Sequence, residues 1–110
     1  MIDATLTRLR ALGFLDERRF AESAAERARR RGHGSEYVRA QLASQGVADS
    51  LIEEVVGATF GDEADLARQA LARHYSTPPQ RPAERAKAAR FLLRRGFPEA
   101  VVADVLGDIS

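Results

Sequence analysis

A helix-ending corner that recurs along the chain limits what this sequence can fold into. Residues 90–106, RFLLRRGFPEAVVADVL, join one amphipathic segment, ending at Gly96, to a second. Residues 42–56 repeat the arrangement fifty positions earlier around Gly46, and a weaker copy near the start ends at Gly13. Glycine suits the end of a helix because it adopts the left-handed conformation without a side-chain penalty. The chain is therefore expected to be a tandem array of helix–corner–helix units.

Local signals divide the chain into helices. Asp16, Ser35 and Asp62 suit N-cap positions, because their short polar side chains can accept a hydrogen bond from the first turn. Three prolines within residues 76–82 predict a loop. No segment alternates polar and apolar residues with a period of two, so no strand is expected. Helices are expected over residues 2–12, 16–31, 35–46, a following segment to about 59, 62–75, 83–95 and 98–107.

These helices group into an all-α, elongated array of tandem three-helix units. Residues 1–31 are predicted to form an incomplete first unit. Its long helix, 16–31, is shared with the second unit, 16–61, and residues 62–110 form the third. The repeat is thus the basis for dividing the chain.

The predicted cores are built from small apolar side chains. Leu6 and Leu9 are expected on the inner face of the first helix, and Leu15 with Phe20 should form a hydrophobic staple around the next helix start. Small residues on one helix face let a neighbouring helix lie close. That face is expected to carry Ala21, Ala24, Ala25 and Ala28.

Several classes of function are disfavoured by the sequence. The chain has no cysteine, hence no disulfide framework and no thiolate metal site, which suits a cytoplasmic protein. It has no membrane-length apolar run, no signal peptide and no glycine-rich phosphate loop. His33 and His74 stand far apart, and we expect both on the surface or in loops rather than at a metal. We predict no catalytic residue, no metal and no cofactor.

Charge alternates in blocks that follow the repeat. Residues 8–31 carry a net charge of +4, residues 48–66 carry −6, and residues 67–95 carry +7, although the whole chain sums to +1. Arginine supplies nearly all of the positive charge, and its planar fork grips phosphates and carboxylates. The first and second helices of a unit are therefore basic and the third is acidic. An acidic third helix argues against a helix-turn-helix module that reads the major groove.

The candidate binding residues lie on two basic helix faces. At 100° per residue, Arg19, Arg27 and Arg30 fall within an arc of about 80°. Lys87, Arg90 and Arg94 fall within about 60°. Such stripes suit a phosphate backbone or acidic protein patches. The full candidate set is Arg19, Arg27, Arg30, Arg31, Lys87, Arg90, Arg94 and Arg95.

The alternative is that these faces are merely solvated. In that case Arg18 with Glu22, and Glu26 with Arg30, would be ordinary pairs one helical turn apart, each worth roughly 0.3 kcal/mol. The sequence leaves both interpretations open.

Three motifs resemble the RecX family of regulators. They are LGFLDERRFAES (12–23), the segment 34–47 ending in QLASQGV, and RFLLRRGFPEAVVADVL (90–106). Within the first, Asp16, Arg19 and Phe20 match the family's acidic, arginine and aromatic positions, while Glu17 replaces a second aspartate. The motifs follow the family's order along nearly the whole chain. Family members usually begin with a further helix, so a short or truncated form is expected.

The resemblance implies a curved, non-enzymatic protein that modulates the RecA recombinase. It would lie along the groove of a RecA–DNA filament, contact single-stranded DNA there, and suppress ATP hydrolysis, strand exchange and co-protease activity. It implies roles in DNA repair and the SOS response. Direct DNA binding is expected to be weak, and the protein is expected to be monomeric, with no membrane contact. A helical module acting directly on nucleic acid and a helical-repeat adaptor for another protein remain as alternatives.

One stability prediction follows from the corner itself. Replacing Gly96 by valine should cost on the order of 1–2 kcal/mol, because a β-branched residue resists the left-handed conformation. Thermal unfolding measures this loss, and an unchanged midpoint would mean that the corner is not left-handed.

Overall fold

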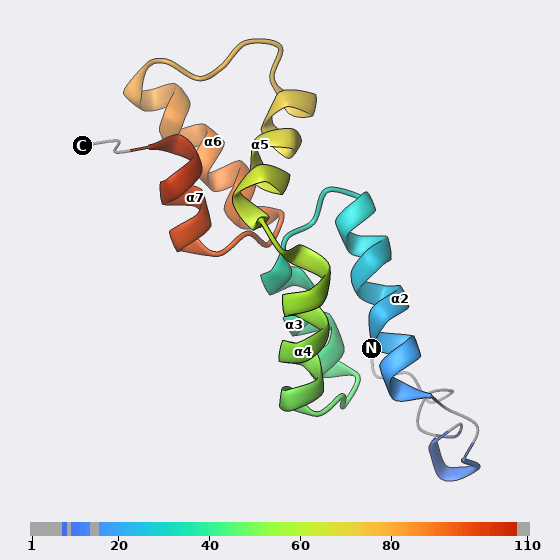
Figure 1. The fold of residues 1–110 in the computed structure, drawn as a ribbon. Coiled ribbons are helices and arrows are strands. Elements are labelled where there is room, and N and C mark those ends of the chain that lie inside the picture. Colours follow the sequence, from blue (N-terminus) through green and yellow to red (C-terminus); the bar gives the residue numbers. More distant parts are fainter. Residues whose placement is uncertain (1–7, 9, 14–15, 108–110) are drawn as a thin grey trace.

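The computed structural model describes residues 8, 10–13 and 16–107, and within them it contains helices and no strand. Two groups of three helices lie end to end in a molecule of 55 × 24 × 21 Å (Figure 1). The predicted elongated, all-α array is therefore confirmed. The helices are α2 (Glu17–Arg30), α3 (Ser35–Ser44), α4 (Asp49–Phe60), α5 (Glu63–His74), α6 (Pro82–Arg94) and α7 (Glu99–Leu106).

Part of the N-terminal prediction cannot be compared with the structure. Arg8, Arg10 and Ala11 are helical, as expected for the predicted helix 2–12. Leu6 and Leu9, and Leu15 of the hydrophobic staple, lie outside the described residues. The incomplete first unit and the exact limits of the three units therefore stay predictions.

The predicted corners at Gly46 and Gly96 are present and have the same geometry. Gly13 has a left-handed φ of +74°, and Phe14, which follows it, lies outside the described residues. Gly46 and Gly96 have φ of +84° and +95°. At the first corner the Val47 N–H donates to the Leu42 carbonyl at 3.0 Å, and at the second the Phe97 N–H donates to the Leu92 carbonyl at 3.1 Å. Val47 and Phe97 are buried, so each packs back on the helix that has just ended. These contacts are those of a Schellman motif.

A third corner of this type ends α2. Gly32 has φ of +83°, and the His33 N–H donates to the Ala28 carbonyl at 3.0 Å. His33 thus occupies the position that valine and phenylalanine hold in the other two corners. The side chain that follows this corner is consequently a titratable aromatic one.

Two of the three predicted N-caps are confirmed. The Asp16 carboxylate accepts from the Arg19 N–H at 3.1 Å, and Asp62 accepts from the Asp65 N–H at 3.3 Å. The prediction for Ser35 was wrong, because Gly34 is the N-cap of α3.

Ser35 instead lies fully buried in the first turn of α3. Its Oγ donates to Oε1 of Glu63 at 2.8 Å, and its N–H donates to Oε2 of the same carboxylate at 2.7 Å. A carboxylate from the start of α5 therefore caps α3. Neither contact could be read from a local cap pattern, because 28 residues separate the partners.

Each group of helices has its own core. The core of α2–α4 is built on the predicted alanine face, and Ala21 and Ala25 have no exposed surface. The core of α5–α7 centres on Phe97, Leu92 and Ala67. Leu66 of α5 packs against both cores. We call α2–α4 and α5–α7 the second and third units.

The two units meet through two glycine corners in backbone contact. The Gly34 N–H donates to the Arg95 carbonyl and the Glu36 N–H donates to the Gly96 carbonyl, both at 2.8 Å. A Cβ on Gly34 would lie 2.6 Å from the Gly96 oxygen, and one on Gly96 would lie 2.6 Å from Cβ of Tyr37. Valine at position 96 would therefore meet Tyr37 in addition to its backbone strain.

Candidate basic site at the junction of the two units

The eight predicted binding residues are accessible and are not paired with any acidic residue that the structure describes. All are exposed except Arg95, which is half-buried. None of them forms an ion pair within the described part of the chain. Four other arginines do form such pairs, and they are Arg10, Arg18, Arg29 and Arg39. The candidate set is thus distinguished from the paired arginines by its unneutralised charge.

The ion pairs differ from those expected for a solvated helix face. Arg18 does not pair with Glu22 but donates to Glu54 of α4 at 2.7 Å. Glu26 does not pair with Arg30 but accepts from Arg29 at 2.6 Å. Arg18 can reach α4 because the alanine face of α2 lets that helix lie close.

The acidic helix α4 therefore neutralises arginines of its own unit. Besides the pair with Arg18, its Glu53 carboxylate accepts from Arg39 of α3 at 2.9 Å. This hydrogen bond with Arg39 lowers the pKa of Glu53, and the same contact raises the pKa of Arg39. The alternation of charge along the sequence is thus partly explained, because α4 neutralises arginines of α2 and α3. Arg19, Arg27 and Arg30 of α2 form no ion pair with the residues that the structure describes.

Arg31 and Arg95, from opposite ends of the sequence, are brought together at the junction. Nη1 of Arg95 donates to the Arg31 carbonyl at 3.3 Å, and its guanidinium carbon lies 5.3 Å from the centre of the Phe91 ring. The two contacts hold the Arg95 side chain in place while leaving its charge unneutralised. Arg95 is therefore the most firmly positioned of the predicted residues.

A small hollow of about 110 Å³ opens beside this contact. It lies between the end of α2, α5 and the end of α6. None of the described residues that line it carries a carboxylate. Its lining residues are Arg31, Gly32, Ala70, Arg73, His74, Phe91 and Arg95. We call this hollow the junction pocket.

Arg73 is not among the residues predicted to bind, and His74 was expected only on the surface or in a loop. Both stand in the last turn of α5, where cations are favoured by the negative end of the helix dipole. That signal was available in the sequence. The convergence of the C-terminal ends of α2, α5 and α6 at one point was not, because it depends on how the units pack.

Two histidine stacks border the junction. The His33 ring lies parallel to Tyr37 with 3.9 Å between centroids, and the His74 ring lies parallel to Phe91 at 4.0 Å. His33 is a half-buried loop residue and His74 is exposed. Burial lowers the pKa of His33, and the positive charges of Arg95 and Arg31 lower it further. The uncharged form of His33 is thus favoured beside the arginines.

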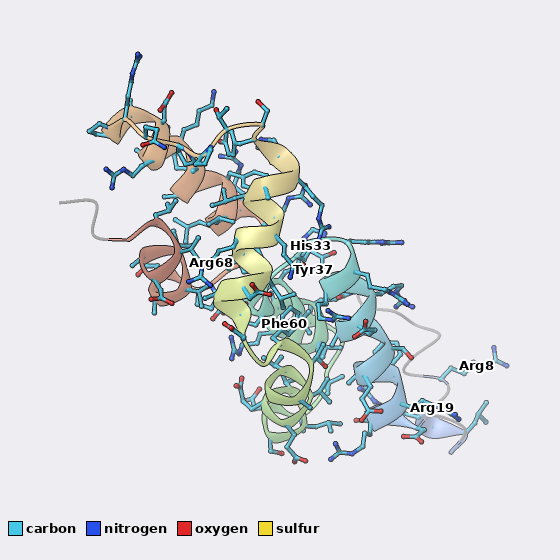
Figure 2. The ribbon with its side chains drawn as sticks, turned by 45° about the horizontal axis from the view of Figure 1, so that its top comes forward. Arg8, Arg19, His33, Tyr37, Phe60 and Arg68 are labelled. Carbon is cyan, nitrogen blue, oxygen red and sulfur yellow. The ribbon has the colours of Figure 1, made fainter. Side chains whose placement is uncertain are left out.

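The remaining predicted residues do not join this pocket. Arg19 lies at the opposite end of α2 from His33 (Figure 2). Arg27 and Arg30 are exposed along α2, and Lys87, Arg90 and Arg94 are exposed along α6. The structure therefore places them on basic helix surfaces outside the pocket itself.

Two parts of the chain match models of a known protein family. Residues 16–56 match the second three-helix domain of RecX, and residues 61–106 match its third three-helix domain. The chain belongs to the RecX family.

Individual RecX proteins are similar over most of the chain. The regulatory protein RecX of Chromohalobacter salexigens is 39% identical over 85 residues, which cover 77% of this chain and 56% of that protein. That of Leptothrix cholodnii is 35% identical over 105 residues, covering 96% and 66%. That of Thermus thermophilus is 38% identical over 99 residues, covering 90% and 63%. The chain spans between half and two thirds of the length of these relatives.

The junction pocket lies where the two RecX domains meet, with Arg31 from the second domain and Arg73 and Arg95 from the third. Arginine forks around a hollow without carboxylates can bind phosphate oxygens through charge-assisted hydrogen bonds.

Among the described residues no three histidine, aspartate or glutamate side chains are grouped to hold a metal ion. The described helices are too short or too polar to traverse a lipid bilayer.

Proposed function

We propose that this RecX-family protein inhibits the RecA recombinase by binding along the groove of the RecA–DNA filament. It suppresses ATP hydrolysis, strand exchange and co-protease activity without catalysing a reaction, and it acts as a cytoplasmic monomer in recombination control. The observation that carries this proposal is the set of exposed arginines that form no ion pair with another described residue, on an elongated member of a regulatory family.

Contacts to filament DNA follow from the shape and charge of the chain. An array 55 Å long can touch several successive phosphates, because one strand in B-form geometry carries one charge per about 3.4 Å of axis. The unpaired arginines supply phosphate contacts, and the junction pocket supplies a site where three of them converge. The net charge of only +1 disfavours tight binding to naked DNA, so the filament protein must contribute surface of its own.

The test is RecA ATP hydrolysis dependent on single-stranded DNA, titrated with this chain. We expect suppression at concentrations that leave naked DNA mostly unbound at the same salt. Charge reversal of Arg27, Arg30, Arg90 and Arg94 should weaken suppression by about tenfold or more, because each contact to phosphate is lost.

Two double variants test whether the junction pocket contributes to suppression of RecA ATP hydrolysis. Arg73→Gln with Arg95→Gln should weaken suppression more than Arg8→Gln with Arg81→Gln, which removes the same charge from exposed positions outside the junction. Equal effects would contradict a role for the pocket. Full suppression by the charge-reversed protein would contradict the proposal as a whole.

The second candidate is a helical module that acts directly on nucleic acid. The convergence of Arg31, Arg73 and Arg95 favours it. It predicts tight binding to naked DNA without RecA, with affinity that falls steeply as salt rises. Tight naked-DNA binding without suppression of RecA would establish this alternative.

A further inference from the structure

A second hollow lies on the third unit. It measures about 570 Å³, within the range of ligand pockets, and it lies between α5, α7 and the proline-rich loop 76–81. Its apolar lining includes Leu71, Tyr75, Pro78, Pro79, Val105 and Leu106. We call it the α5–α7 groove. None of its lining residues belongs to the junction pocket.

One face of α5 forms a wall that is apolar at one end and cationic at the other. Arg68, Leu71, Ala72 and Tyr75 follow one another at helical spacing and all line the groove. Arg68 lies between α5 and α7 (Figure 2) and forms no ion pair with the described residues. The wall therefore offers an apolar surface beside an unneutralised positive charge.

A second cation, Arg85, also lines the groove. Arg85 in the first turn of α6 is half-buried, and its Nε donates to the Gln80 carbonyl at 3.4 Å. Among the described residues that line the groove, none carries a carboxylate. The charge of the lining is thus complementary to an anionic ligand with an apolar portion.

The loop that borders the groove offers backbone groups to a ligand. Residues 76–79 make no hydrogen bond with any other described residue, and the loop is held at its end where Gln80 and Arg81 donate to Glu84. The N–H groups of Ser76 and Thr77 and the carbonyls of residues 76–79 can pair with an extended peptide. In such recognition the backbone supplies hydrogen bonds and an adjacent pocket holds a side chain.

We propose that the α5–α7 groove binds a peptide segment of a partner protein that carries bulky apolar side chains flanked by carboxylates. The apolar side chains enter between Leu71, Tyr75 and Leu106. The carboxylates pair with Arg68 and Arg85, and the peptide backbone lies along residues 76–79. This site is independent of the proposed action on RecA and of the junction pocket.

The test uses a synthetic peptide with a leucine and a phenylalanine between two pairs of glutamates, titrated into the isotope-labelled full chain. Backbone amide shifts are followed by NMR. We expect saturable shifts confined to residues 68–80, 85 and 105–106, with a Kd of about 1 mM or tighter. Absence of saturable shifts at these residues overturns the proposal, as does equal binding of a peptide with serine in place of its leucine and phenylalanine.

Two variants test the lining without disturbing the core, because both positions are exposed. Arg68→Gln and Ala72→Glu should each raise the Kd of the peptide by about fivefold. The first variant loses the ion pair with a peptide carboxylate, and the second adds a carboxylate that repels it. Arg8→Gln removes the same charge far from the groove and should leave the Kd unchanged. Equal weakening by all three would mean non-specific attraction. Displacement of the peptide by oligothymidine at the same residues would assign the groove to nucleic acid and overturn the proposal.

Discussion

His33, at the junction of the two units, has a structural role and also lies beside the positive charges of two arginines. His33 follows the left-handed Gly32, stacks on Tyr37 and faces the guanidinium groups of Arg95 and Arg31. Its pKa lies below its ordinary value of about 6.5, firstly through burial and then through the two arginines. The folded state therefore binds a proton at His33 less readily than the unfolded state does.

This difference predicts a pH dependence of stability. The contribution of His33 is fully present above its unfolded pKa of about 6.5 and is lost as the pH falls through its lower folded pKa. We expect the free energy of unfolding to fall between about pH 7.5 and 5.5, and to fall less in His33→Gln. Denaturant titrations at several pH values measure both slopes. Parallel curves for the two proteins would contradict this prediction.

At the scale of helices, the alanine face of α2 sets how closely the second unit packs. Ala25 has no exposed surface and sits in the core shared with Val55 and Val56 of α4. Close approach of the two helices also lets Arg18 reach Glu54. A small residue is therefore required here for packing as well as for the ion pair.

Ala25→Leu should destabilise the protein by about 1–3 kcal/mol, because the added atoms have no space in a packed core. Ala103→Leu, an exposed position on α7, should change stability by less than about 0.5 kcal/mol. Chemical unfolding of both variants provides the comparison. A neutral Ala25→Leu would show that α2 and α4 can separate without loss.

At the scale of the whole molecule, backbone contact between two glycine corners joins the units. Gly34 contributes an N–H to the Arg95 carbonyl, and it leaves no room for a side chain against Gly96 and Phe97. Ser35 and Glu63 add a buried hydrogen-bonded contact beside it. The angle between the units, and with it the junction pocket, depends on these contacts.

Gly34→Ala should therefore cost about 1–3 kcal/mol and alter the relative orientation of the units, because its Cβ would lie 2.6 Å from the Gly96 oxygen. Gly57→Ala is the control, since a Cβ there meets nothing within 4 Å and alanine favours the interior of a helix by about 0.5–1 kcal/mol. Thermal unfolding and small-angle scattering measure the two effects. An unchanged scattering profile for Gly34→Ala would contradict a rigid junction.

The sequence by itself determined the helices that the structure describes, most of their ends and the family. Those features depend on contacts between near neighbours, such as Val47 with Leu42 or Asp16 with Arg19, so spacing alone reveals them. It also indicated which residues carry the basic faces, although their role in binding stays a prediction.

Only the tertiary structure decided which charges are neutralised and which converge. Arg18 pairs across 36 positions with Glu54, Ser35 across 28 with Glu63, and Arg95 across 64 with Arg31. The local rules that predicted a Ser35 cap and pairs one helical turn apart could not anticipate these contacts. The physical reason is that ion pairs and buried hydrogen bonds form with whichever group packing brings within reach, and packing of the two units is a property of the whole chain.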